Sequence, residues 1–145
     1  MADYDSIFVD SNYFIALFNA SDTLHPETVS IAENMVVQNV RLCTSNYIVT
    51  EVLTVLSQRV GKQSAILAME SLSNNEQIKM IHVTEELHQQ SLDIFKTVKP
   101  KNVSLVDCSI LAILDYANIK QLLTFDITDF KPLASRFNFK LLSNQ

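Results

Sequence analysis

Four acidic residues stand next to apolar segments or within them: Asp10, Glu51, Asp107 and Asp126. Burying an unpaired charge costs several kcal/mol, so each position needs a compensating interaction. Three have ordinary structural explanations, with Asp10 as a helix N-cap, Asp126 as a turn residue and Asp107 in a capping box with Ser104. Glu51 is harder to explain, because it lies too far into its helix to cap it and has no evident Lys or Arg partner.

The four acids together favour a metal site. Carboxylates gathered at one edge of a domain repel one another and raise one another's pKa values, and a divalent cation removes that conflict. Hard oxygen ligands suit Mg²⁺ or Mn²⁺, whereas the chain has no Cys/His spacing typical of zinc sites. We therefore expect Mg²⁺ or Mn²⁺ as the cofactor.

The apolar pattern predicts strands that alternate with helices, which is typical of a parallel sheet covered on both faces. Strands are predicted at residues 6–9, 41–45, 78–83, 121–125 and 137–142, and helices at 11–20, 25–40, 46–59, 62–72, 84–98 and 104–118, with a short turn or helix at 128–133. The letters TEEL at 84–87 indicate a capping-box start. Asp10 and Asp126 directly follow strands, and ligands gather at the carboxyl ends of such strands.

Composition limits the class of protein. The chain has 145 residues, which predicts a single domain spanning residues 1–145, and its one glycine excludes glycine-rich phosphate loops. A net charge of −5 does not suggest a general nucleic-acid coat protein, although a nuclease with an acidic metal site remains compatible. The basic residues form groups that we expect to be solvated surface, and any of them could follow a phosphate backbone: Arg59 and Lys62; Lys96, Lys99 and Lys101; Lys131, Arg136 and Lys140.

Cysteine use and hydropathy predict the compartment. Cys43 and Cys108 lie among apolar neighbours and form no CxxC pair, so we expect reduced, buried thiols. The start, MADYDS, is polar and acidic, unlike a signal peptide, and no apolar run reaches the roughly 18 residues that a membrane span needs. We therefore expect a cytoplasmic protein with no membrane segment.

Four segments in order, FVDSNYFIALF, SNYIVTEVLTVL, SLVDCSILAIL and LLTFDITDF, resemble the PIN-domain ribonucleases, and the resemblance covers nearly the whole chain. It implies a three-layer α/β/α fold with a central parallel sheet of four or five strands. The acids of that family fall on Asp10, Glu51, Asp107 and Asp126.

The resemblance also implies a reaction, the metal-dependent hydrolysis of RNA phosphodiester bonds. Asp10 and Asp107 would be the inner metal ligands, while Glu51 would bind metal directly, bind it through water, or orient the nucleophile. Two further positions matter: Ser11 is the small polar residue after the first acid, with Asn12 beside it as hydrogen-bonding support. Asp129 is an alternative to Asp126 as the fourth acid.

A compact domain of this kind resembles the VapC-type toxin of a bacterial toxin–antitoxin pair. The resemblance implies a homodimer that is silenced by a small antitoxin protein and acts on an RNA substrate. A housekeeping nuclease would look alike, and the alternative is a catalytically inactive PIN-fold RNA-binding or regulatory module. A phosphotransfer receiver domain is disfavoured because it would need paired acids near the first strand, whereas Asp10 has no acidic neighbour.

Overall fold

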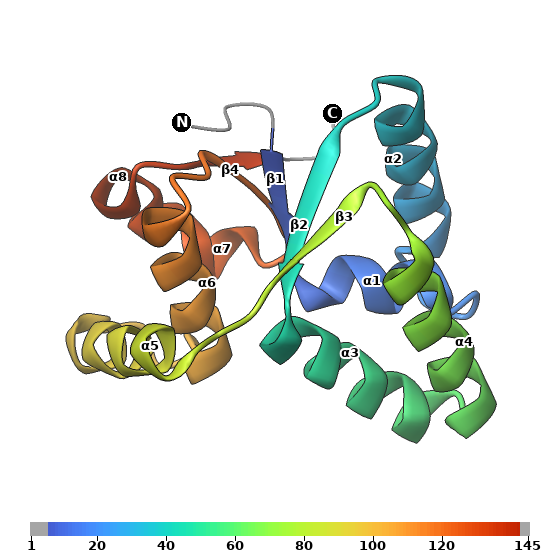
Figure 1. Ribbon diagram of the computed structural model, residues 1–145, viewed down its shortest axis with the longest axis horizontal. Helices are drawn as coiled ribbons and strands as arrows, with labels where there is room; N and C mark the ends of the chain where they lie inside the picture. Colours follow the sequence, from blue (N-terminus) through green and yellow to red (C-terminus); the bar gives the residue numbers. More distant parts are fainter. Residues whose placement is uncertain (1–5, 143–145) are drawn as a thin grey trace.

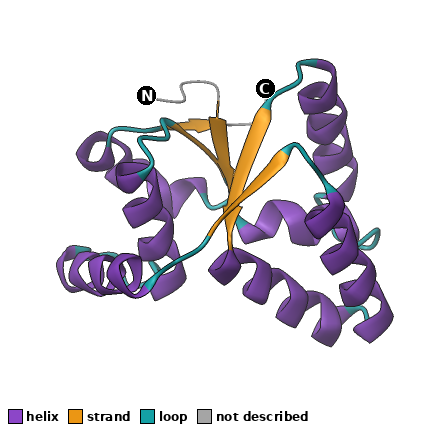
Figure 2. Ribbon diagram, in the orientation of Figure 1, coloured by secondary structure: helices purple, strands orange, loops and turns teal. Residues whose placement is uncertain are grey.

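The computed structural model describes residues 6–142, so the polar start of the chain at 1–5 and the end at 143–145 lie outside the described part. A five-stranded parallel sheet runs through it in the order β3-β2-β1-β4-β5 (Figures 1 and 2), as predicted. The strands are β1 (Ser6–Val9), β2 (Arg41–Ser45), β3 (Ile78–Ile81), β4 (Gln121–Leu123) and β5 (Lys140–Leu142).

Helices flank the sheet on both sides, which makes the predicted three-layer α/β/α arrangement. On one side lie α1 (Ser11–Phe18), α2 (His25–Val37), α3 (Asn46–Arg59) and α4 (Lys62–Asn74) (Figure 1). On the other lie α5 (Glu85–Thr97), α6 (Leu105–Tyr116), α7 (Ile127–Phe130), the 3₁₀ turn η1 (Lys131–Leu133) and α8 (Ala134–Phe137). Within residues 6–142, no helix combines the length and the apolar character that crossing a bilayer requires.

Strand order places a crevice at one edge of the sheet. β1 lies in the centre, with Phe8 in register with Cys43 of β2 and with Leu122 of β4. From β1 the chain first builds outward through β2 and β3, then returns to the other side of β1 for β4 and β5. The carboxyl ends of β1 and β4 therefore border a topological switch point, where ligands bind in open α/β sheets.

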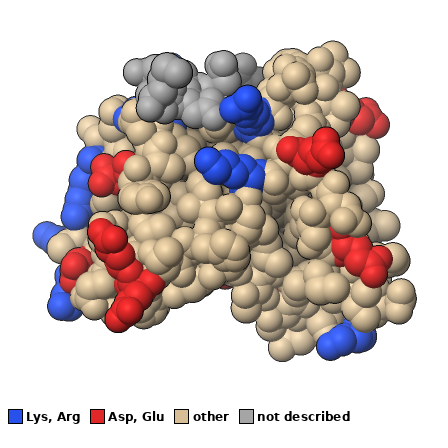
Figure 3. All heavy atoms as spheres, viewed as in Figure 1, with Lys and Arg blue, Asp and Glu red and all other residues tan. Residues whose placement is uncertain are grey.

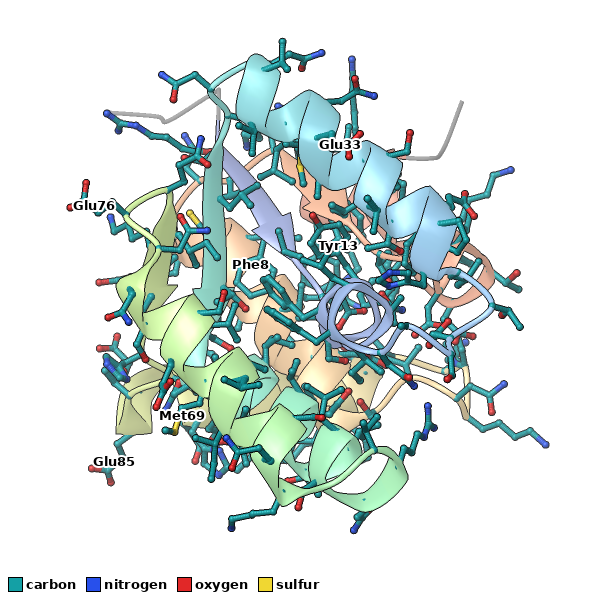
Figure 4. All side chains as sticks on the ribbon, turned by 90° about the vertical axis from the view of Figure 1, so that its right-hand side faces the viewer. Phe8, Tyr13, Glu33, Met69, Glu76 and Glu85 are labelled. Carbon is teal, nitrogen blue, oxygen red and sulfur yellow. The ribbon has the colours of Figure 1, made fainter. Side chains whose placement is uncertain are left out.

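The core packs against both faces of the sheet. In α6 every residue from Cys108 to Leu114 is buried, which matches the continuous apolar pattern of that segment. Figure 4 shows Phe8 and Tyr13 turned into the core, where they are 0% and 2% exposed. Burial raises the pKa of the Cys108 thiol to about 11, so this cysteine is protonated at neutral pH and a poor nucleophile.

The end of the chain differs from the prediction. The predicted strand at 137–142 is wrong in its first part, because Phe137 ends α8 and β5 begins only at Lys140. The amides of Asn138 and Phe139 both bond to the Ala134 carbonyl, and Asn138 takes the left-handed conformation (φ 54°) that ends a helix. Alternating aromatic residues looked like a strand there, whereas the local hydrogen bonds form a helical turn.

The predicted capping box at residues 84–87 is also only half correct. Thr84 caps α5, since its hydroxyl oxygen accepts the Leu87 N–H at 3.3 Å. The third helical position is Leu87, whose side chain has no acceptor to return a bond. A capping box needs a side-chain acceptor at the third helical position; α6 has Asp107 there, whereas α5 has Leu87.

Candidate active site

Asp10 is the most deeply buried of the four acids. It follows β1 directly and is 2% exposed. Its Oδ1 accepts the Ser11 backbone N–H at 2.7 Å, so it does cap α1, and its Oδ2 accepts the Thr124 hydroxyl at 2.8 Å. Burial raises the pKa of Asp10 from 3.8 to about 7; the charges of Asp107 and Asp126 raise it too, while its two hydrogen bonds lower it.

Thr124 connects three parts of this site. It directly follows β4 and is 1% exposed. Its hydroxyl has one proton, which it donates to Asp10, so its oxygen accepts from Asn12 Nδ2 (3.2 Å) and from the Asp126 backbone N–H (3.0 Å). Asn12 also accepts the Phe125 N–H at its Oδ1 (3.1 Å). The segment after β4 is thereby tied to the segment after β1.

Glu51 reaches the site from the second turn of α3. Its Oε1 accepts the Ser11 hydroxyl at 2.5 Å. The same hydroxyl lies 3.4 Å from Asp10 Oδ1, and because it carries a single proton the shorter contact to Glu51 is the stronger bond. A hydroxyl, rather than the Lys or Arg partner sought in the sequence, therefore holds this carboxylate.

Asp107 both completes a helix capping box and lies close to other acids. Its backbone N–H donates to the Ser104 hydroxyl oxygen (3.1 Å), and its Oδ2 accepts the Ser104 N–H (2.9 Å), so the predicted capping box is complete. Burial raises the pKa of Asp107 to about 6, the bonds from Ser104 lower it, and the charges of Asp126 and Glu51 raise it. The capping box uses Oδ2 of the Asp107 carboxylate and leaves its other oxygen, Oδ1, out.

Asp126 and Asp129 lie at the open side. Asp126 is exposed and precedes α7, and its side chain makes no capping bond. Partial burial, then the charge of Asp129, raises the pKa of Asp126, and a hydrogen bond from Asn12 lowers it. Asp129 is half-buried in the first turn of α7. The two acids are thus close enough to interact, and Asp126 is the one that also acts on Asp10 and Asp107.

The fold therefore brings the acids close enough for Asp107 and Asp126 to raise the pKa of Asp10, and for Asp126 and Glu51 to raise the pKa of Asp107. Their oxygen donors fit Mg²⁺ or Mn²⁺. Within residues 6–142, however, no three His, Cys, Asp or Glu side chains already surround a single metal-sized position. Hydrogen bonds with Ser11 and Ser104 hold Glu51 and Asp107 in their present rotamers.

Sequence reasoning missed Thr124. It lies 114 residues from Asp10 and contacts it only because β1 and β4 are neighbours. The available signal was its position at the end of a strand, two residues before a candidate acid in the letters TFD. A threonine is common in strands, however, so that signal alone does not separate a packing residue from one that holds a carboxylate.

The fold and the acid cluster define a known class of protein. The family model of the PIN domain matches residues 7–134, so the chain belongs to the PIN-domain family. It is similar to the 23S rRNA-specific endonuclease VapC20 of Mycobacterium tuberculosis, with 28% identity over 120 residues that cover 83% of this chain and 88% of that protein. The predicted resemblance to PIN-domain ribonucleases of the VapC toxin type is confirmed.

Solved structures agree with this assignment. The crystal structure of Mycobacterium tuberculosis VapC20, described as a sarcin–ricin loop cleaving toxin, matches with a TM-score of 0.76 and 26% identity, covering 88% of this chain and 94% of that one. A toxin–antitoxin complex from Klebsiella pneumoniae matches with a TM-score of 0.65 and 17% identity, over 96% of this chain and 98% of that one. The second likeness shows the shared fold.

Proposed function

We propose that this protein is a divalent-cation-dependent endoribonuclease and the toxin half of a toxin–antitoxin pair. The observation that supports the proposal is that Asp10, buried and hydrogen-bonded at both oxygens, lies close enough to Asp107 and Asp126 for their charges to raise its pKa, while Glu51 acts on Asp107 in the same way. A retired site would have no reason to keep a carboxylate buried at a cost in stability.

Asp10 and Asp107 are the residues that we assign to hold the cation, with Asp126 as a third ligand. When bound, a divalent cation activates a water molecule and offsets the charge that develops on the scissile phosphate. Thr124 and the Ser11 amide fix the orientation of Asp10, and Asn12 keeps the strand ends together. The Ser11 hydroxyl donates to Glu51, which would bind the cation, directly or through water, or orient the attacking water.

Substrate and partners are inferred from relatives. VapC20 acts on 23S rRNA, so we propose a structured RNA hairpin as the substrate of this chain. Several matching structures are toxin–antitoxin complexes, including those of Klebsiella pneumoniae and Salmonella typhimurium. They support a small antitoxin as a partner, and we further propose a homodimer that acts in the cytoplasm.

One experiment tests this function directly. Purified protein, freed of any antitoxin, is incubated with a labelled RNA hairpin that has the sarcin–ricin loop sequence, with Mg²⁺, Mn²⁺ or EDTA. We expect cleavage only with metal and its loss in Asp107→Asn, while Cys108→Ala, a neighbouring change outside the acid cluster, retains activity. Tight RNA binding without cleavage under every metal condition would instead identify an inactive RNA-binding module.

A further inference from the structure

Charge is distributed unevenly along this acidic chain. Two segments, residues 94–106 and 130–142, together contain six cations and no carboxylate, whereas the rest of the chain holds all sixteen acids and the other five bases. The first segment leads directly into Asp107, and the second begins immediately after Asp129. In the sequence, each basic segment thus adjoins one of the candidate acids.

The fold places these two segments together. Arg136 of α8 donates from Nη2 to the Thr97 hydroxyl oxygen in the last turn of α5, at 2.8 Å. The Arg136 guanidinium also lies over the Phe137 ring, 4.8 Å from its centroid. In Figure 3 blue side chains lie along the left-hand edge of the molecule, where Figure 1 shows α5 and α8, and red side chains lie among them.

Five residues form what we call the basic surface: Lys96, Lys99, Lys101, Lys131 and Arg136. All five are exposed, and within residues 6–142 no carboxylate forms an ion pair with any of them. The sixth cation, Lys140, starts β5 and so lies toward the amino edge of the sheet, away from the acids. Exposed cations in two segments that adjoin Asp107 and Asp129 in the sequence form a surface complementary to a polyanion.

Helix dipoles explain only part of this pattern. Lys96 and Arg136 lie in the last turns of α5 and α8, where cations stabilise a helix. Lys99 and Lys101 instead lie in the connection between α5 and α6, outside the last turn of either helix, so stabilisation of a helix dipole does not explain them. Phe95, in the last turn of α5, is 49% exposed, and its aromatic ring is of the kind on which unpaired bases stack.

We propose that the basic surface binds the phosphate backbone of the RNA substrate and directs the scissile strand into the acid cluster. The proposal rests on the proposed nuclease function and adds the path of the RNA to it. Acids that hold a cation repel the flanking phosphates, so cations just outside the cluster offset that repulsion. The connection before α6 is well placed, because Ser104 at its end also holds Asp107.

The salt dependence of cleavage tests the proposal. The double variant Lys99→Gln/Lys101→Gln is compared with Arg59→Gln/Lys62→Gln, which removes the same charge at the α3–α4 connection on the other side of the sheet. For a labelled RNA hairpin we expect the first variant to raise KM about 5- to 20-fold in 0.1 M salt, with kcat within about twofold. The slope of log KM against log salt should fall by about 1–2, since each lost phosphate contact removes about 0.7–0.9.

The matched variant decides the interpretation. We expect Arg59→Gln/Lys62→Gln to leave both KM and the salt slope unchanged, while Phe95→Ala raises KM without changing the slope. Equal effects of the two double variants, or none from Lys99→Gln/Lys101→Gln, would show that the basic surface is ordinary solvated surface and overturn the proposal. Thermal unfolding confirms that these exposed substitutions leave the fold intact.

The two proposals fail in different ways. If the wild-type protein cleaves no RNA, the nuclease function is contradicted, and the anisotropy of a fluorescent RNA hairpin then measures binding by the same variants. If Lys99→Gln/Lys101→Gln binds this RNA more weakly and Arg59→Gln/Lys62→Gln does not, the result still supports RNA binding by the basic surface. Cleavage by wild type with unchanged KM in that variant rejects only the RNA path.

Discussion

Asp10 directly follows β1, Asp126 lies three residues after the end of the neighbouring strand β4, and the two acids have opposite surroundings. Each follows a strand at the same edge of the sheet. Asp10 is 2% exposed and accepts hydrogen bonds at both oxygens, whereas Asp126 is exposed and makes no capping bond. Thr124 joins the two, since its hydroxyl donates to Asp10 and accepts the Asp126 amide.

This difference separates a fixed acid from an adaptable one. Two hydrogen bonds and close packing leave Asp10 a single orientation, so it can define where a cation sits. Asp126 is exposed, and both its backbone N–H, which donates to Thr124, and a side-chain hydrogen bond from Asn12 hold it less tightly than close packing holds Asp10. Preorganisation on one side of the site and freedom on the other suit a cation that must also accept substrate oxygens.

Asp10→Asn should have the largest effect. The amide keeps the size of the side chain but removes the buried negative charge that holds the cation, so we expect metal-dependent RNA cleavage to fall at least about 10³-fold. Initial rates at saturating Mn²⁺ measure the loss. Activity within tenfold of wild type would show that Asp10 serves only as the cap of α1.

Thr124→Val should have the next largest effect. Valine matches the shape of threonine but cannot donate to Asp10, so we expect a loss of about 10- to 100-fold, the usual size for a residue that orients a metal ligand. Thr124→Ser retains the hydroxyl and should recover most of the activity. If Thr124 positions Asp10, Thr124→Val should need more Mn²⁺ for activity than Thr124→Ser. A packing defect would instead lower the thermal unfolding temperature of Thr124→Val without changing its metal requirement.

Asp126→Asn and Asp129→Asn compare the two acids of the open side. Asp126 acts on both Asp10 and Asp107, whereas Asp129 acts on Asp126. We expect Asp126→Asn to lower activity about tenfold and Asp129→Asn to lower it less than about threefold. The reverse order in initial cleavage rates would make Asp129 the fourth acid and would weaken the contrast with Asp10.

The last prediction concerns the pH dependence of stability and involves no change in RNA cleavage. Without metal, the folded protein holds protons on Asp10 (pKa about 7) and Asp107 (pKa about 6) where an unfolded chain, with a pKa of 3.8, has released them. The folded state thus binds more protons between about pH 4 and 7, so the free energy of unfolding falls as pH rises through that range.

Urea unfolding in EDTA measures this fall, which we expect to reach about 2–4 kcal/mol between pH 5 and 8. Asp10→Asn cannot ionise, so its curve should be flatter. Added Mg²⁺ favours the ionised acids and should stabilise the protein more at pH 8 than at pH 5. A wild-type curve that rises with pH in EDTA would contradict the buried, protonated state of Asp10.

Local patterns predicted most of the fold. The periodicity of apolar residues located the strands at 6–9 and 41–45 and the helix at 46–59 with their observed bounds, because a buried strand and an amphipathic helix each leave a distinct repeat. The predicted strand at 121–125 is longer than β4, which ends at Leu123. The next residue, Thr124, leaves the ladder and bonds to Asp10 instead, a contact that no local pattern contains.

The sequence by itself determined the acids, their places next to or within apolar segments, and the capping box of Ser104 and Asp107, since all of these depend on residues a few positions apart. Only the tertiary structure decided which hydroxyl holds which carboxylate. Ser11 meets Glu51 across 40 positions and Thr124 meets Asp10 across 114, and both contacts follow from placing β1 between β2 and β4. Strand order is set by packing of the whole chain, so no short stretch of sequence encodes it.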